Sequence, residues 1–132
     1  MYSKIYLVDD QDLINTLNTM QFRKLGLEDK VRSYTNPELA LDDIRFAKNP
    51  QERILVFLDI NMPEMTGFEF LEFMMLEEFP TTVEVVIVTS SINPRDREQA
   101  KEYSKYVKGF ISSPLKLEDI EHFLQMTMKA VV

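Results

Sequence analysis

Residues 54–67 read ILVFLDINMPEMTG, where an apolar run from Ile54 to Leu58 is followed directly by Asp59. A strand buried on one face is apolar at every second position, whereas this run is apolar at every position. Such a run is typical of a strand buried on both faces of a parallel sheet. Comparable runs rich in β-branched or aromatic residues occur at 5–8, 83–88 and 107–111, with a weaker one at 31–34. The sequence therefore predicts five strands in a parallel sheet covered by helices.

Helical patterns separate these runs. Asn36-Pro37 and Asn93-Pro94 each supply a capping residue and a first-turn proline, which predicts helices over 38–48 and 95–105. Apolar residues at helical spacing predict further helices over 13–24 and 117–131, and another helix begins at Phe68.

Strands that alternate with helices predict an α/β fold. Its expected form is a doubly wound, five-stranded parallel sheet of order 2-1-3-4-5, a flavodoxin-like (βα)₅ unit. The 132 residues contain no repeat or linker, so we expect one domain over residues 1–132.

Composition excludes several classes of protein. The 22 acidic residues outnumber the 15 basic ones, giving a net charge of −7 with no basic run, which argues against direct nucleic-acid binding. Without cysteine there is no disulfide framework, so a cytoplasmic location is expected. No apolar stretch is long enough for a membrane span.

Acidic residues follow two of the predicted strands. Asp9 and Asp10 end the first run and Asp59 ends the third, and a 2-1-3-4-5 sheet brings both ends to its ligand-binding edge. Three adjacent carboxylates repel one another unless a cation neutralises them, and an oxygen-only ligand set favours Mg²⁺, or Mn²⁺ in its place. Alternatively, Asp9, Asp10 and Asp12 cap the first helix.

These residues resemble the receiver domain of two-component response regulators, as in the single-domain chemotaxis regulators. The resemblance rests on Asp9-Asp10, the run from Asp59 through Met62-Pro63 to Gly67, Thr89, Phe110 and Pro114. It covers essentially the whole chain, and the combination of motifs is far more specific than any one of them.

The resemblance implies that Asp59 takes a phosphoryl group from a histidine kinase or a histidine phosphotransfer protein. Asp10, Asp59 and the backbone carbonyl of Asn61 would hold Mg²⁺, with Asp9 acting through water. Thr89 and Phe110 would switch a surface that binds a downstream protein target. Such a domain catalyses only its own phosphorylation and dephosphorylation, so it is not expected to be an enzyme with a turnover substrate.

One position departs from the family pattern. Ser113 stands where the family has a lysine that contacts the phosphoryl oxygens, and Lys116 or Arg95 would have to supply the missing charge. This keeps a second function open, a degenerate receiver that binds proteins without phosphorylation. An aspartyl phosphohydrolase is disfavoured because Asn61 occupies the place of its second acid. The resemblance also implies a cis Ser113-Pro114 bond.

Three further features have simpler interpretations. The only histidine, His122, is expected to be solvated or packed, not a phosphotransfer residue. The Met- and Phe-rich stretch 68–79 is interpreted as core packing, with a partner groove as the alternative. Leu13 and Ile14 are candidate contacts for the phosphodonor, one of them being expected in the core.

Overall fold

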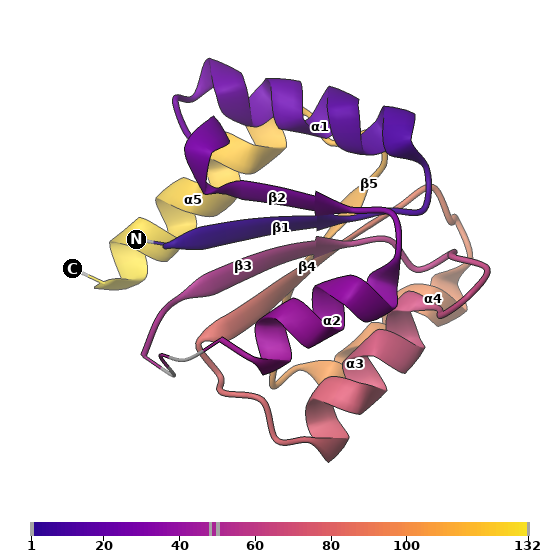
Figure 1. Ribbon diagram of the computed structural model, residues 1–132. Coiled ribbons are helices and arrows are strands. Elements are labelled where there is room, and N and C mark those ends of the chain that lie inside the picture. The colour runs from indigo at the N-terminus through magenta and orange to yellow at the C-terminus, as the bar shows by residue number, and fades with distance from the viewer. Residues whose placement is uncertain (1, 48, 50, 132) are drawn as a thin grey trace.

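The computed structural model describes residues 2–47, 49 and 51–131 (Figure 1). Within them, five parallel strands form one sheet in the order β2-β1-β3-β4-β5, which confirms the predicted topology. The strands are β1 (Lys4–Val8), β2 (Val31–Tyr34), β3 (Ile54–Leu58), β4 (Val83–Thr89) and β5 (Val107–Ser112).

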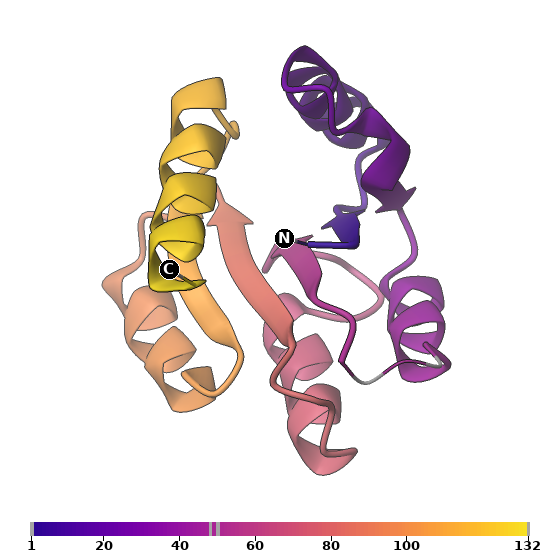
Figure 2. The same cartoon turned by 90° about the vertical axis from the view of Figure 1, so that its left-hand side faces the viewer.

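Helices cover both faces of this sheet. The helices α1 and α5 lie on one face, and α2, α3 and α4 lie on the other (Figures 1 and 2). Their bounds are α1 (Asp12–Lys24), α2 (Pro37–Arg45), α3 (Gly67–Leu76), α4 (Pro94–Ala100) and α5 (Leu117–Val131). Short 3₁₀ turns occupy Glu28–Lys30 and Lys101–Tyr103.

Two helices begin as their caps predict and end earlier. The Asn36 side chain accepts a hydrogen bond from the Glu38 amide at 2.9 Å, and Asn93 accepts one from the Arg95 amide at 3.0 Å. α2 ends at Arg45, short of the predicted 48, and residue 48 lies outside the described residues. α4 ends at Ala100 and continues only as the 3₁₀ turn, not as one helix over 95–105.

The central strands confirm the expectation of burial on both faces. Every residue of β3 is buried, and β1 and β4 are buried along nearly their whole length. Two apolar cores result, one on each face of the sheet. The ends of β1 and β3 lie side by side, because the two strands are paired from Lys4–Ile54 to Val8–Leu58.

α1 reverses the usual placement of polar and apolar side chains. Asn15, Asn18 and Phe22 are its buried residues. The residues whose spacing predicted the helix face outward, with exposed fractions of 68% for Leu13, 47% for Leu17 and 44% for Met20. Ile14 is only half-buried, so the expectation that Leu13 or Ile14 lies in the core is wrong, although Ile14 is the more inward of the two.

The stretch 68–79 is core on one side only. Phe68, Phe70, Leu71, Met74 and Phe79 are buried, whereas Phe73, Met75 and Leu76 are exposed. Core packing alone is therefore wrong as an account of this segment, because α3 supports the sheet with one side and presents apolar residues to solvent on the other.

His122 lies exposed on α5, as expected. None of the helices in the described part of the chain has the length and apolarity needed to cross a membrane.

Candidate functional site

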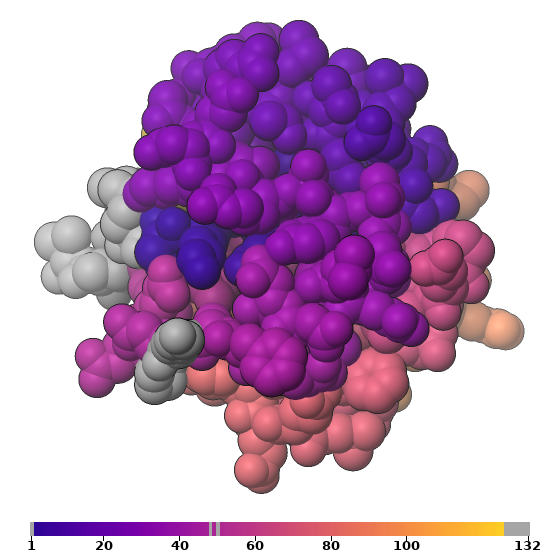
Figure 3. All heavy atoms as spheres, viewed as in Figure 1, coloured from indigo at the N-terminus to yellow at the C-terminus, as the bar shows by residue number. Residues whose placement is uncertain are grey.

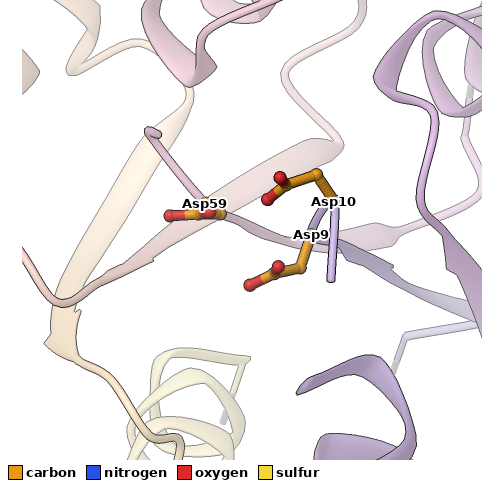
Figure 4. A group of neighbouring side chains, drawn as sticks. All are labelled: Asp9, Asp10 and Asp59. Atoms are coloured by element: carbon orange, nitrogen blue, oxygen red, sulfur yellow. The ribbon is translucent and has the colours of Figure 1, made fainter. Parts of the chain in front are cut away.

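Three carboxylates converge where β1 and β3 end. Asp9 and Asp10 directly follow β1, Asp59 directly follows β3, and the two strands are hydrogen-bonded neighbours. Each residue offers a carboxylate oxygen, and these oxygens lie within 4.8 Å of one another (Figure 4). The predicted acidic cluster is thus brought together by the fold.

The backbone of Asp9 is fixed by a buried amide that the sequence analysis did not single out. The Asn15 side chain donates from Nδ2 to the carbonyls of Asp9 at 3.0 Å and Tyr34 at 3.1 Å, and the Asp9 amide donates to the same Tyr34 carbonyl at 3.2 Å. Asp9 Oδ1 accepts a hydrogen bond from the Gln11 amide at 2.9 Å. Asn15 thereby ties the end of β1 to the end of β2.

Asp59 is held by the turn that follows it. Its amide donates to the Val8 carbonyl at 3.0 Å, and the Asn61 amide donates to Asp59 Oδ1 at 3.3 Å. The Gly67 amide closes the turn on the Ile60 carbonyl at 2.9 Å. A Cβ at Gly67 would lie 2.6 Å from the Asp59 carbonyl oxygen, so only glycine allows this approach.

The cluster has more acceptors than donors. Burial, followed by the charge of Asp9, raises the pKa of Asp59 to about 6 although the Asn61 amide lowers it. Burial also raises the pKa of Asp9. Asp10 Oδ1 is buried without a hydrogen-bond partner, and among the described residues no lysine or arginine lies within ion-pair distance of the three acids.

This environment fits a hard divalent cation. The metal-binding atoms on offer are oxygens only, and one of them is buried and unpartnered. Burial and the neighbouring acids raise the pKa of Asp59, so its negative charge favours a positive partner. The alternative, that the aspartates serve only as a cap, is not supported, because no side-chain hydrogen bond caps α1.

Thr89 lies at the end of β4, next to β3 in the sheet, and is almost fully buried. Its Oγ1 accepts a hydrogen bond from the Ser91 amide at 3.1 Å. The Ser91 hydroxyl donates in turn to the Asp96 carboxylate on α4. This chain of contacts connects Thr89 to α4.

Phe110 is half-buried on β5 and also contacts α4. The Arg97 guanidinium lies over its ring, 4.8 Å from the centroid. Two adjacent residues of α4 therefore contact the two switch candidates. Asp96 accepts a hydrogen bond from the loop after Thr89, and Arg97 lies over the ring of Phe110. Sequence analysis missed both, since neither belongs to a motif and a charged helix usually indicates only a solvated surface.

Ser113 lies beside Thr89, because its amide donates to the Thr89 carbonyl at 2.9 Å. The Ser113-Pro114 bond is cis, which confirms that expectation. Lys116 and Arg95 are both exposed, and neither forms an ion pair in the described part of the chain. No described cation takes the place of the missing lysine.

Comparisons with known proteins agree with this arrangement. The family model of the response regulator receiver domain matches residues 5–125. A two-component response regulator of Cytophaga hutchinsonii superposes with a TM-score of 0.81 at 26% identity, over 96% of each chain. Chemotaxis protein CheY4 of Vibrio cholerae has the same fold, with a TM-score of 0.76 at 23% identity over 96% of this chain and 98% of that one.

A curated relative has a related sequence. The chain is 27% identical over 123 residues to the probable methanogenesis regulatory protein FilR2 of Methanothrix harundinacea (strain 6Ac), a match that spans 92% of this chain and 78% of that protein. With a family match over nearly the whole chain, the protein belongs to the response regulator receiver domain family of two-component signalling.

Proposed function

We propose that Asp59 accepts a phosphoryl group from a phosphohistidine on a histidine kinase or phosphotransfer protein. The observation that carries the proposal is that Asp9, Asp10 and Asp59 converge at one edge of the sheet. The pKa of Asp59 is raised there, and no described lysine or arginine pairs with the three acids. An Asp59 carboxylate oxygen attacks phosphorus, the P–N bond breaks, and its electron pair stays on the imidazole nitrogen. The product is an acyl phosphate on Asp59.

Asp10, Asp59 and the Asn61 carbonyl would hold Mg²⁺ or Mn²⁺, with Asp9 acting through water. Such an ion, when bound, neutralises charge on the carboxylates and phosphoryl oxygens. The chain itself positions the nucleophile, since the Asn61 amide orients the Asp59 carboxylate and the Val8 carbonyl fixes its backbone. Positioning and charge neutralisation are the main requirements of phosphoryl transfer.

Thr89 and Phe110 are the proposed switch. Thr89 Oγ1 accepts from the Ser91 amide, which leaves the hydroxyl proton free to be donated to a phosphoryl oxygen. A Thr89 that moves toward that oxygen would pull the Ser91 loop and, through Asp96, α4. Arg97 would then shift over Phe110 and change the surface offered to a downstream protein target.

The exposed apolar side of α1 supports docking of the phosphodonor. Leu13, Leu17 and Met20 face solvent on the helix that begins just after Asp10, while Asn15 faces the interior. A helix that turns its apolar residues outward is suited to contact a partner. A donor on this surface would bring its phosphohistidine to the acidic edge.

A degenerate receiver is the second candidate function. It is favoured by Ser113, which supplies no charge, and by the lack of a substitute cation among the described residues. Under this function Asp59 would stay unmodified, and the same surfaces would bind partners directly. The two candidates differ in whether Asp59 forms an adduct.

The test is adduct formation with acetyl phosphate or beryllofluoride in Mg²⁺. Intact mass should show one phosphoryl group on the native protein, and amide NMR shifts should centre on residues around Asp59. Asp59→Asn should abolish both signals, whereas Asp12→Asn, at an exposed acid of the first turn of α1, should keep them. An unresponsive native protein, or an equal response in Asp59→Asn, would leave the degenerate receiver as the function.

A further inference from the structure

The segments of α2 and α3 lie side by side at the surface (Figure 3). Four exposed apolar side chains on α2, its C-cap and α3 define what we call the α2–α3 face. The exposed fractions are 56% for Leu39, 73% for Phe46, 41% for Phe73 and 70% for Leu76. Leu39 and Phe46 are two helical turns apart and Phe73 and Leu76 are one turn apart, so each pair shares a side of its helix. This face plays no part in the proposed phosphoryl transfer.

A groove runs between the two helices beside these side chains. Its volume is about 220 Å³, and it is lined by Glu38, Leu41, Asp42, Arg45, Met65 and Phe73. Arg45 crosses from α2 to α3, where its guanidinium donates to Glu77 at 2.7 Å, and it also pairs with Asp42. Buried Leu41 and Met65 therefore form the apolar base of the groove, and the charged side chains lie toward its rim.

Among the described residues, acids outnumber bases on this face, since Glu38, Asp42 and Glu77 surround Arg45. α3 and its C-cap contain Glu69, Glu72 and Glu77 and no lysine or arginine. Glu38 and Glu69 are exposed beside the apolar side chains, and Arg45 is already paired with two acids. The face thus presents apolar anchors within a negative rim.

The negative rim of the α2–α3 face limits which kind of partner can bind there. A second copy of the chain, bound about a two-fold axis, would set the negative rim against itself, and an anionic membrane would be repelled in the same way. A helix with apolar residues on one side and lysine or arginine beside them matches both the anchors and the rim. We propose that the α2–α3 face docks a basic amphipathic helix of a partner protein.

This site is separate from the α1 face, although both expose leucines. α1 carries Arg23 and Lys24 in its last turn, whereas α3 has no basic residue. Because the α2–α3 face requires neither Asp59 nor a metal, its binding should persist in Asp59→Asn. Failure of the phosphoacceptor proposal and failure of this one are therefore distinguishable.

The probe is a 14-residue helical peptide of leucine and lysine, compared with a peptide of the same pattern in which glutamate replaces lysine. Titrated into the ¹⁵N-labelled chain, the lysine peptide should shift amides of α2 and α3, and raising the NaCl concentration should weaken it. The glutamate peptide should bind at least tenfold more weakly. Sedimentation of the chain alone should show no association through this face.

The decisive variants remove the anchors. Phe73→Ser with Leu76→Ser should weaken the lysine peptide at least tenfold, because two apolar contacts are lost. The matched control, Leu13→Ser with Leu17→Ser on α1, should change binding less than twofold, and thermal unfolding should show that both variants fold. Shifts centred on α1, equal binding of the glutamate peptide, self-association through the face, or unchanged affinity in the α3 variant would each overturn the proposal.

Discussion

Asp43 and Asp59 are two carboxylates near β1 in opposite surroundings. Asp43 on α2 accepts hydrogen bonds from the Tyr34 hydroxyl at 2.6 Å and the Tyr6 hydroxyl at 3.0 Å, and these lower its pKa. Asp59 faces other acids, and burial raises its pKa to about 6. The difference teaches that two side-chain donors lower the pKa of one carboxylate, whereas burial among other acids outweighs the backbone donor of the other and leaves it suited to a cation.

The phenols of the Asp43 cluster stay protonated at ordinary pH. Burial and then the hydrogen bond to Asp43 raise the pKa of Tyr34 to about 12, and the same causes raise the pKa of Tyr6 further. The two rings also pack together with centroids 5.8 Å apart. The hydrogen bonds and the ring contact of this cluster thus link β1, β2 and α2.

The largest effect is expected from placing a positively charged donor beside Asp59, which would make its surroundings more like those of Asp43. Ser113→Lys should speed adduct formation at Asp59 about tenfold to a hundredfold, since a charge-assisted contact is worth about 1.5 to 3 kcal/mol. The pKa of Asp59 should fall toward its ordinary range. Rates from intact mass with acetyl phosphate measure the first effect, and carboxyl NMR titration measures the second.

The matched control is Ser112→Lys at the exposed neighbouring position. It adds the same charge at the end of β5 and should change the rate by much less. If both variants respond alike, long-range charge explains the effect; if neither responds, another group already fills the role of the lysine.

Replacing aspartate with asparagine should change the free energy of unfolding in opposite directions at Asp59 and Asp43. In the absence of Mg²⁺ at pH 7, Asp59→Asn should raise the free energy of unfolding by about 1 to 2 kcal/mol, because the pKa shift, reduced for solvent screening, measures the cost of the charge. Asp43→Asn should lower it by about 1 kcal/mol through weaker acceptance from both phenols. Urea unfolding of the three proteins would measure both changes, and equal signs would contradict the contrast.

The pH dependence should separate the two sites further. Folded Asp59 holds its proton to a higher pH than its ordinary pKa of 3.8, so its destabilisation develops as pH rises from about 4 to 7. The advantage of Asp59→Asn should therefore vanish near pH 4. Asp43 has a lowered pKa, so its stabilisation is present above about pH 4 and is lost on acidification. Urea midpoints across this range would test both directions.

The smallest expected effect is that of one phenol donor. Tyr34→Phe should cost about 1 kcal/mol, the usual net value of a hydrogen bond. In the Asp43→Asn background the same change should cost clearly less, because the two residues act through one contact. Full additivity in this double-mutant cycle would show that the hydrogen bond contributes nothing.

Sequence patterns predicted the parts of the molecule that depend on local signals. Continuous apolar runs indicated the buried strands, Asn36 and Asn93 indicated helix starts, and the acids after two runs indicated the site. Which side of α1 packs against the sheet was not predictable in this way. The helical spacing of apolar residues locates a helix, but it does not say which of its sides is buried. Asn15 is buried by its bonds to two strand ends, a non-local fact.

The contacts on α4 were hidden for a related reason. Asp96 and Arg97 look like solvated helix residues, and their partners Ser91 and Phe110 are reached only after folding. Ser113 was visible from the sequence as a departure, but only the folded chain shows that neither Lys116 nor Arg95 forms an ion pair with the acids.

Tyr34 joins the two carboxylate regions. Its carbonyl accepts hydrogen bonds from Asp9 and Asn15, while its hydroxyl binds Asp43. These hydrogen bonds connect the β1–β2 side of the acidic edge to the cluster of Tyr6, Tyr34 and Asp43. If Asp59 takes a phosphoryl group as proposed, we expect the resulting displacement on the opposite side, where Thr89 is connected to α4 through Ser91 and Asp96. The hydrogen bonds on one side of the site would then set the direction in which a signal leaves it.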